Sequence, residues 1–149
     1  MKIVLQRVTE AKVEVGGETV GEIGKGYLIL LGVSDTDTEE TADKMIEKIA
    51  KLRIFEDENG KTNLSIDAVE GDVLVVSQFT LYADCKKGNR PSFTKAGSAD
   101  KANALYEYVL KKCGPLFRKT AHGVFGADMK VTLTNDGPFT LVLDSQEIL

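Results

Sequence analysis

Short apolar stretches separated by glycine-containing turns occupy the first third of the chain and predict β-strands. Residues 2–8 are apolar and β-branched, while residues 11–15 and 18–23 alternate around the dipeptide Gly16-Gly17. Alternation with a period of two on both sides of such a turn is typical of a β-hairpin. Residues 27–33 form an unbroken apolar run, which predicts a strand buried on both faces.

Two later segments carry apolar residues at helical spacing. Asp37 and Glu40 have the spacing of a capping box and predict the start of the first helix. Its apolar stripe is Ala42, Met45, Ile46, Ile49 and Leu52. The second helix is expected to begin at Ser98 or Asp100 and to end at Gly114-Pro115. Its apolar stripe is Ala102, Leu105, Val109, Leu110 and Cys113.

The remaining segments complete an α+β pattern. Residues 55–62 predict a turn, residues 72–78 a buried strand, and residues 129–134 and 139–143 two closing strands. Strands in sequential blocks with two helices favour an α+β fold over a doubly wound one. We expect one domain, residues 1–149, with mostly antiparallel sheets that form a partly closed, barrel-like sandwich under two main helices.

Composition is that of an ordinary folded domain. The 149 residues are 42% hydrophobic and 28% charged, which excludes intrinsic disorder as a description of the chain. No apolar run approaches the roughly 18 residues that a membrane helix needs, and Gln6 and Arg7 interrupt any signal-peptide core. Cys85 and Cys113 are interpreted as reduced thiols in a cytoplasmic protein.

Charge is distributed unevenly along the chain. Residues 35–72 hold 12 acidic and 5 basic residues, whereas residues 86–119 hold 9 basic and 2 acidic ones, within a net charge of -4. This asymmetry can present a positive face to an anionic partner, although the solvated faces of two helices explain it equally well. The loop at 86–97 is basic and without periodicity, which indicates a mobile or functional segment.

The residue patterns that several common kinds of active site require are absent from the sequence. His122 is the single histidine, and no G-x-S-x-G segment presents a serine, so a Ser-His-Asp triad is disfavoured. We interpret His122 as structural or as a surface residue. No C-x-x-C spacing and no Walker A or G-x-G-x-x-G segment is present, so we expect neither a metal nor a cofactor.

Two segments concentrate groups suited to a site. Residues 77–84 place hydroxyl, amide and aromatic side chains directly after a buried strand, where polar groups can be held rigidly at a pocket. Taken alone, the segment also fits an amphipathic strand end with Phe79 and Leu81 inward. Residues 135–140 contain Gly137-Pro138, and their spacing alone favours an ordinary tight turn between two strands.

Taken together, these segments resemble the two signature motifs of the D-aminoacyl-tRNA deacylase family, also called D-tyrosyl-tRNA deacylases. The motifs read SQFTL at 77–81 and NDGPFT at 135–140. The resemblance extends to KIVLQRV at 2–8, GYLILLGV at 26–33, KKGNRPSF at 86–93 and FGADM at 125–129. Several separated blocks in register make the resemblance specific, and no signature position departs from it.

The resemblance implies a cytoplasmic homodimer that hydrolyses the ester between a D-amino acid and the 3′-terminal adenosine of tRNA. It also implies removal of misplaced glycine. The expected partner is D-aminoacyl-tRNA, with no DNA and no membrane. The substrate pocket is expected at the subunit interface.

The resemblance also implies roles for particular residues. A cis Gly137-Pro138 bond is expected to reach into the partner's pocket and reject L-amino acids, with Arg7 holding it in place. The expected catalytic segment is Ser77, Gln78, Phe79 and Thr80, in which a backbone N–H near Phe79 stabilises the oxyanion. With the substrate so identified, the expected tRNA phosphate contacts are Lys86, Lys87 and Arg90.

Two other functions stay open at this point. The basic stretch alone is compatible with a non-catalytic RNA-binding dimer. The strand-rich body is compatible with a structural or small-ligand-binding dimer.

Overall fold

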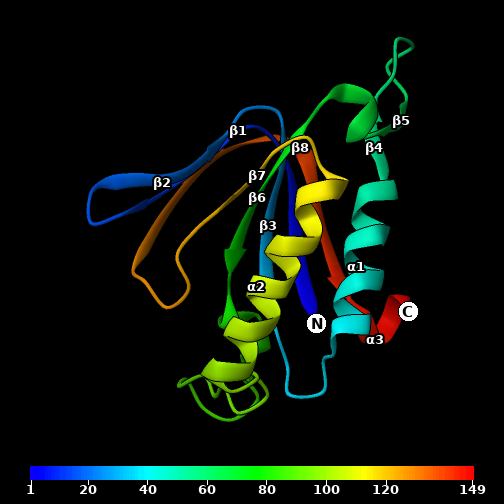
Figure 1. Ribbon diagram of the computed structural model, residues 1–149. Coiled ribbons are helices and arrows are strands. Elements are labelled where there is room, and N and C mark those ends of the chain that lie inside the picture. The colour runs from blue at the N-terminus through cyan, green and yellow to red at the C-terminus, as the bar shows by residue number, and fades with distance from the viewer.

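A six-stranded mixed sheet forms the body of the computed structural model, which describes all 149 residues (Figure 1). Its strands are β1 (Lys2–Val15), β2 (Glu18–Ile23), β3 (Gly26–Gly32), β6 (Asp72–Ser77), β7 (Thr120–His122) and β8 (Met129–Asp144). A separate two-stranded sheet consists of β4 (Arg53–Glu56) and β5 (Thr62–Ser65). The helices are α1 (Glu39–Lys51), α2 (Ala99–Leu116) and α3 (Ser145–Ile148), with 3₁₀ turns η1 (Asp67–Val69) and η2 (Phe79–Tyr82).

Strand β1 organises the sheet. Its first half pairs with β3, its second half with β2, and both halves pair with β8, always antiparallel. The β3–β6 and β6–β7 pairs are parallel. Because parallel neighbours need a crossover connection, α1 and α2 lie in the links between these strands.

The sheet curls until β2 reaches β7. The Lys119 ammonium donates to the Glu22 carbonyl at 2.9 Å. A Cβ at Gly21 would lie 2.5 Å from the backbone oxygen of His122, so a residue without a side chain permits this approach. The curl gives the nearly closed sheet that was expected.

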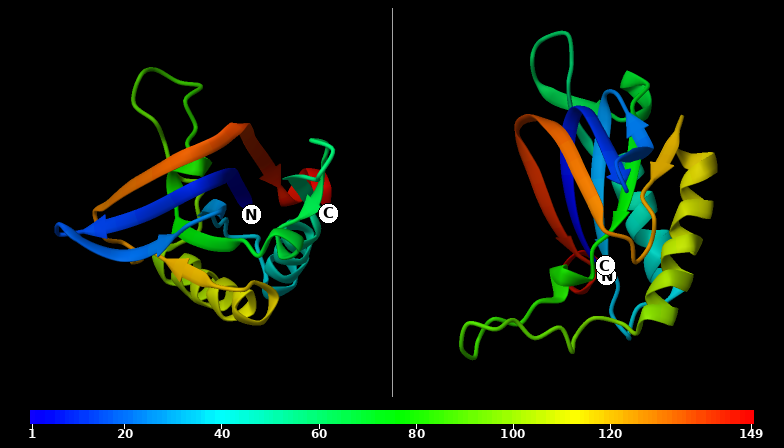
Figure 2. Two further views of the ribbon diagram at one scale, coloured as in Figure 1. Left: turned by 90° about the horizontal axis from the view of Figure 1, so that it is seen from above. Right: turned by 90° about the vertical axis from the view of Figure 1, so that its left-hand side faces the viewer.

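The predicted α+β class is confirmed, and both main helices lie on one face of the sheet (Figure 2). Four of the six strand pairs are antiparallel, as expected, and the other two are parallel. No helix combines the length and the apolarity that crossing a bilayer requires.

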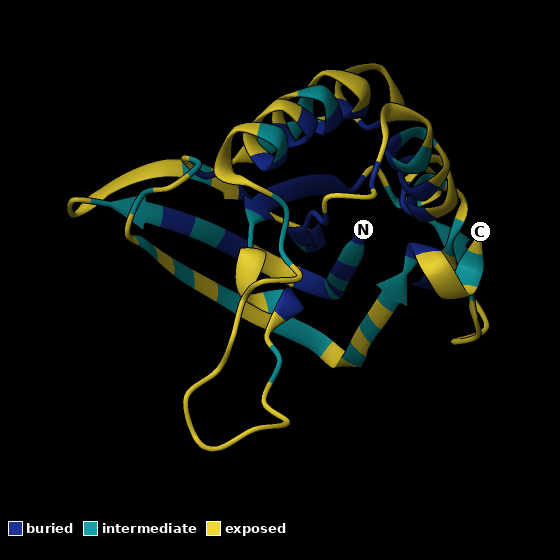
Figure 3. Ribbon diagram, turned by 90° about the horizontal axis from the view of Figure 1, so that it is seen from below, coloured by how far each residue is buried: buried dark blue, intermediate teal, exposed yellow.

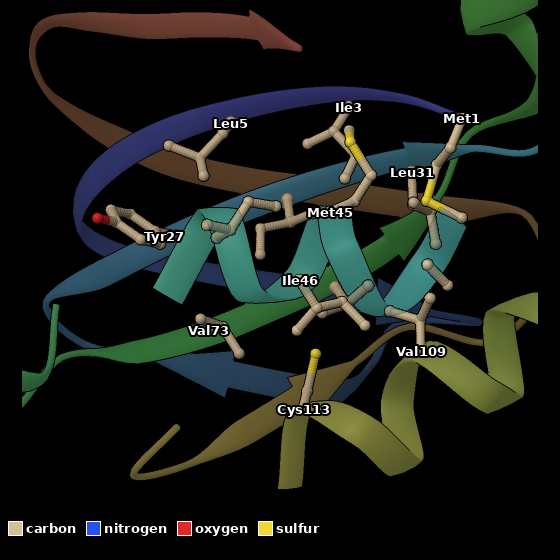
Figure 4. Packing of buried hydrophobic residues seen from close by; sticks show 14 of the residues in the cluster. Met1, Ile3, Leu5, Tyr27, Leu31, Met45, Ile46, Val73, Val109 and Cys113 are labelled. Atoms are coloured by element: carbon tan, nitrogen blue, oxygen red, sulfur yellow. The ribbon is translucent and has the colours of Figure 1, made fainter. Parts of the chain in front are cut away.

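Apolar side chains from the sheet and from both helices form the main core. Figure 4 shows Ile3 and Leu5 of β1 facing Met45 of α1, with Val109 and Cys113 of α2 closing the cluster. Burial raises the pKa of the Cys113 thiol to about 12, so this cysteine is a neutral core residue. A second cluster of seven buried residues fills the inside of the curl: Val8, Ala11, Val13, Ile23, Leu28, Leu74 and Val76.

The predicted helix boundaries need two corrections. Helix α1 is capped by Thr38, which exchanges hydrogen bonds with Thr41, and not by Asp37 and Glu40. The Asp37 carboxylate is occupied by the Ser34 N–H, at 2.7 Å, and by the Met1 amino group. It therefore closes the preceding turn and cannot cap the helix.

Helix α2 does not stop at Gly114-Pro115 but continues to Leu116. A proline in the last turn removes only one backbone donor. The Phe117 N–H donates to the Cys113 carbonyl at 3.0 Å and closes the helix beyond it.

Tyr106→Phe is expected to lower the free energy of unfolding by about 1 kcal/mol. The Tyr106 hydroxyl is buried and donates to the Val75 carbonyl at 3.0 Å, linking α2 to β6. Thermal unfolding of the two proteins measures the change. The matched control is Tyr108→Phe, whose hydroxyl bonds the partly exposed Asp43, and an equal loss in both variants would contradict the expectation.

Candidate active site

A cavity of about 600 Å³ opens where β6 ends. Ten of its 15 lining residues are hydrophobic, and its polar groups come from the expected catalytic segment and from Asp128. The lining comprises Val76, Ser77, Gln78, Phe79, Phe93, Ala96, Gly97, Ala99, Ala102, Phe125, Gly126, Ala127, Asp128, Met129 and Val131. A largely apolar cavity with a few polar groups at one wall is the usual form of a small-ligand site.

Backbone donors are free at this wall. Residues Phe79 and Thr80 begin η2, so their N–H groups precede its first internal hydrogen bond. Gln78 N–H donates to the Leu31 carbonyl at 2.8 Å and Leu81 N–H to the Gln78 carbonyl at 3.3 Å, whereas those of Phe79 and Thr80 have no partner in the chain. Free N–H groups beside an apolar cavity can bind a developing negative charge.

The four residues of the expected catalytic segment are not equivalent. Ser77, Gln78 and Phe79 line the cavity, whereas Thr80 is exposed and does not. The Gln78 amide donates to the Thr80 hydroxyl, which ties these two side chains to each other. The catalytic role of each residue stays a prediction.

Residues 135–138 form a corner within one strand, so the tight turn expected from spacing is wrong. Strand β8 pairs with β1 on both sides of this corner without reversing direction, and the register shifts between Gln6 and Glu10. The Gly137-Pro138 peptide bond is cis, as expected. Figure 2 shows the sharp bend of β8 at this point.

Side chains, not a turn hydrogen bond, satisfy the backbone of the corner. The Asn135 amide donates to the carbonyls of Arg7, at 3.0 Å, and Phe139, at 2.9 Å. A Cβ on Gly137 would meet the Asn135 side-chain oxygen and would lie 2.6 Å from the Phe139 nitrogen. Glycine is therefore the residue that fits here.

Arg7 joins the corner to two other strands. Its guanidinium donates to the Asp136 carbonyl at 2.9 Å and to the Ile54 carbonyl of β4 at 2.6 Å. It also lies 4.6 Å from the centroid of the Phe139 ring, and the residue is only 6% exposed. A buried, planar cation that makes several hydrogen bonds is a rigid support for the segment that it contacts.

Within one chain the corner and the cavity are separate. Gly137 and Pro138 are exposed and are not among the cavity-lining residues. In Figure 1 the bend of β8 lies near the top, and the loop after η2 lies at the bottom. The two segments that carry the resemblance therefore do not meet in the single chain.

The basic loop of residues 85–91 is exposed, and hydrogen bonds between the residues that flank it hold its two ends together. Asp84 and Ser92 exchange two backbone hydrogen bonds of 2.7 and 2.9 Å. The Lys86 backbone N–H and the Lys95 ammonium bind the Asp84 carboxylate and lower its pKa. Figure 3 shows the loop exposed along its length. Lys86, Lys87 and Arg90 are not among the residues that line the cavity.

His122 lies outside the cavity. Its ring Nδ1 is 2.7 Å from the Gly123 carbonyl oxygen, and the side chain is exposed on β7. No group of three or more His, Cys, Asp or Glu residues is arranged to hold a metal ion.

Sequence reasoning assigned no role to several cavity residues. Phe125, Asp128 and Met129 belong to the block at 125–129 and Phe93 ends the basic block at 86–93, and neither block by itself indicates a cavity. A signal was available in the sequence, because residues 86–93 and 125–129 belong to the same set of family-like blocks as the expected catalytic residues. Only the fold shows that these segments share one cavity.

Comparisons with known proteins identify the family of this chain. A family model described as D-Tyr-tRNA(Tyr) deacylase matches residues 4–144. A protein of Thermosipho melanesiensis named D-aminoacyl-tRNA deacylase is 51% identical over 149 residues, covering 99% of both chains. One of Pasteurella multocida with the same name is 55% identical over 144 residues, covering 97% of this chain and 99% of its own.

Two solved structures share the fold. A protein described as c-Myc DNA Unwinding Element Binding Protein is 43% identical with a TM-score of 0.91, covering 97% of this chain and 98% of that one. A structure described as a probable eukaryotic D-amino acid tRNA deacylase is 18% identical with a TM-score of 0.83, over 95% and 97% of the two chains. Since the family match spans nearly the whole chain and includes both signature segments, this chain belongs to the D-Tyr-tRNA(Tyr) deacylase family.

Proposed function

We propose that this protein hydrolyses the ester that joins a D-amino acid to the 3′-terminal adenosine of tRNA, releasing the free D-amino acid and the tRNA. The observation that carries the proposal is the largely apolar cavity lined by Phe79, whose backbone N–H has no partner in the chain. The relatives named D-aminoacyl-tRNA deacylase support the same substrate.

The reaction needs no side-chain nucleophile. Water adds to the ester carbonyl, the Phe79 N–H stabilises the resulting oxyanion, and the ribose 3′-oxygen leaves with a proton. The neighbouring ribose 2′-hydroxyl helps to activate the water. An aminoacyl ester is intrinsically labile, so a chain whose only histidine lies outside the cavity can still carry out this hydrolysis.

Thr80→Ala is expected to retain turnover within about tenfold of the unchanged protein, since positioning effects of a single exposed hydroxyl are of this order. The Thr80 hydroxyl bonds Gln78 and lies outside the cavity lining. Single-turnover hydrolysis of D-aminoacyl-tRNA measures the rate. Complete loss of turnover with intact substrate binding would show that the hydroxyl is the nucleophile.

Selection between enantiomers is proposed to come from a second subunit. Two enantiomers have the same volume and polarity, so only the placement of rigid groups can separate them. In a homodimer with its active site at the interface, Gly137-Pro138 of one subunit enters the cavity of the other and fills the space that an L side chain needs. Glycine has no side chain to reject, so mischarged glycyl-tRNA is also a substrate.

The exposure of Gly137 and Pro138, away from their own chain's cavity, supports this arrangement. Arg7 keeps the corner fixed through the contacts described above. The proposed compartment is the cytoplasm, where aminoacylated tRNA is found.

Incubation of the purified protein with D-, L- and glycyl-tRNA tests the proposal. We expect cleavage of the D and glycyl esters and survival of the L ester. Retention of tRNA without cleavage would instead support a non-catalytic RNA-binding dimer, and neither binding nor cleavage would support a structural or small-ligand-binding dimer.

Replacing Lys86 and Lys87 by alanine is expected to weaken tRNA binding without changing the preference for D over L. Each lost phosphate contact makes the slope of log K against log salt shallower by about 0.7 to 0.9. A salt titration of tRNA affinity measures that slope. The matched control replaces Lys48 and Lys51, two exposed residues of α1, and equal slopes in the two double variants would contradict the assignment.

A further inference from the structure

Two aromatic rings are exposed side by side at the cavity. Phe79 is 56% exposed and Phe93 is 37% exposed, although most large apolar side chains of the chain are buried. Their centroids are 5.2 Å apart at an interplanar angle of 71°, an edge-to-face contact that leaves ring surface free. Both line the cavity, so this uncovered apolar surface is continuous with the proposed substrate site.

Phe93 is held firmly in place. It directly follows Ser92, which is clamped to Asp84 by the two backbone hydrogen bonds at the loop base. On its other side the Ala96 N–H donates to the Phe93 carbonyl at 3.0 Å, and the Gly97 N–H donates to the Val33 carbonyl at 2.8 Å. The ring is therefore a preformed surface.

Positive charge lies on the same segment. Lys86, Lys87 and Arg90 belong to the basic loop that closes immediately before Phe93. An aromatic surface beside a run of cations is the arrangement by which proteins bind single-stranded nucleic acid: bases stack on the rings while the cations follow the phosphates.

We propose that Phe93, supported by the edge contact of Phe79, stacks the base of the penultimate nucleotide of the tRNA 3′ end. This inference rests on the proposed function. The terminal aminoacylated nucleoside occupies the cavity, so the next unit of the strand is the one that reaches its exposed rim. The phosphate chain then continues toward Lys86, Lys87 and Arg90, which lie outside the cavity.

A double-mutant cycle between protein and RNA tests this subsite. D-aminoacyl-tRNA is prepared with and without the base of the penultimate nucleotide, and each is given to the unchanged protein and to Phe93→Ala. Loss of one base–aromatic stack costs roughly tenfold or more in affinity. We expect either change alone to raise KM about tenfold with kcat retained, and the two together to cost no more than one. Independent, multiplying losses would overturn the proposal.

Substitutions separate stacking from packing. Phe93→Tyr is expected to behave as the unchanged protein, and Phe93→Leu, which keeps apolar bulk without a ring, as Phe93→Ala. Val20→Ala on β2, at an exposed apolar residue outside the cavity lining, is the matched control. If Phe93→Ala instead lowers the oligomeric mass in sedimentation and loses activity on both RNAs, a second copy of the chain covers the ring and the subsite is wrong.

The same RNAs distinguish a failed subsite from a failed function. If the unchanged protein cleaves no D-aminoacyl-tRNA, the proposed function is wrong. The stacking contact can still be tested by equilibrium binding of the uncharged tRNAs with and without the penultimate base. A tenfold affinity difference in the unchanged protein that disappears in Phe93→Ala would sustain the subsite, and equal affinities would end it.

Discussion

Phe79→Pro is expected to lower kcat on D-aminoacyl-tRNA by roughly a hundred- to a thousandfold, the usual effect of losing one oxyanion donor. The substitution removes the Phe79 N–H, which has no partner in the chain and faces the ester in the proposed mechanism. Proline is tolerated at the first position of a helical turn, where the N–H has no internal partner. Single-turnover hydrolysis measures the rate without interference from product release.

Phe79→Ala is the matched control for this experiment. It removes the same ring and keeps the N–H, so the ratio of the two rates isolates the backbone donor from side-chain packing. Circular dichroism checks that both variants are folded. Equal rates for the proline and alanine variants would show that the donor lies elsewhere, and the Thr80 N–H would be the next candidate.

Arg7→Ala is expected to lower the free energy of unfolding by about 3 kcal/mol, because it leaves two carbonyls near the core without their donor and opens a void. The carbonyls are those of Asp136 and Ile54. The same change frees the corner of β8, so hydrolysis of L-aminoacyl-tRNA is expected to rise relative to that of the D ester. Chemical denaturation measures the first effect and paired hydrolysis assays the second.

Arg7→Lys separates charge from geometry. Lysine keeps a cation but cannot donate in two fixed directions from a planar group. We expect it to recover part of the stability and little of the discrimination. A variant Arg7→Ala that keeps both full stability and an unchanged preference for D would exclude a supporting role for this residue.

The periodicity of apolar residues predicts the helices and strands that bury an apolar face in the core. The apolar faces of α1 and α2, the β1–β2 hairpin and the buried run of β3 all lie where the pattern indicated. Short elements were missed, since β4, β5 and β7 have three or four residues each and too few positions for a pattern. They are strands because their neighbours supply the hydrogen bonds.

The corner of β8 shows why local signals have a limit. Asparagine, aspartate, glycine and proline in succession favour a reversing turn. Here the corner is held by Arg7, which lies 129 positions before Asp136 in the sequence. The backbone carbonyl of Arg7 accepts a hydrogen bond from the Asn135 side-chain amide, and its guanidinium donates one to the carbonyl of Asp136. Contacts with so distant a residue let the chain bend and continue along β1, and no short window of sequence contains that information.

The candidate site was predictable in its parts more than in its assembly. The segment at 77–79 lines the cavity, as expected of a polar strand end. Phe93, Phe125 and Met129 arrive from other parts of the chain, and their meeting depends on how the sheet curls. Residue type identifies side chains that are able to act in catalysis, whereas the topology of the fold decides which of them line the same cavity.

The separation of the β8 corner from the cavity has a consequence for working concentration. Strand β8 is paired with β1 along both of its arms, so a lone subunit cannot swing its own corner across to its own cavity without undoing the sheet. If the corner sorts the enantiomers, stereochemical accuracy obeys mass action: progressive dilution should erode the distinction between mirror-image esters while the individual fold persists.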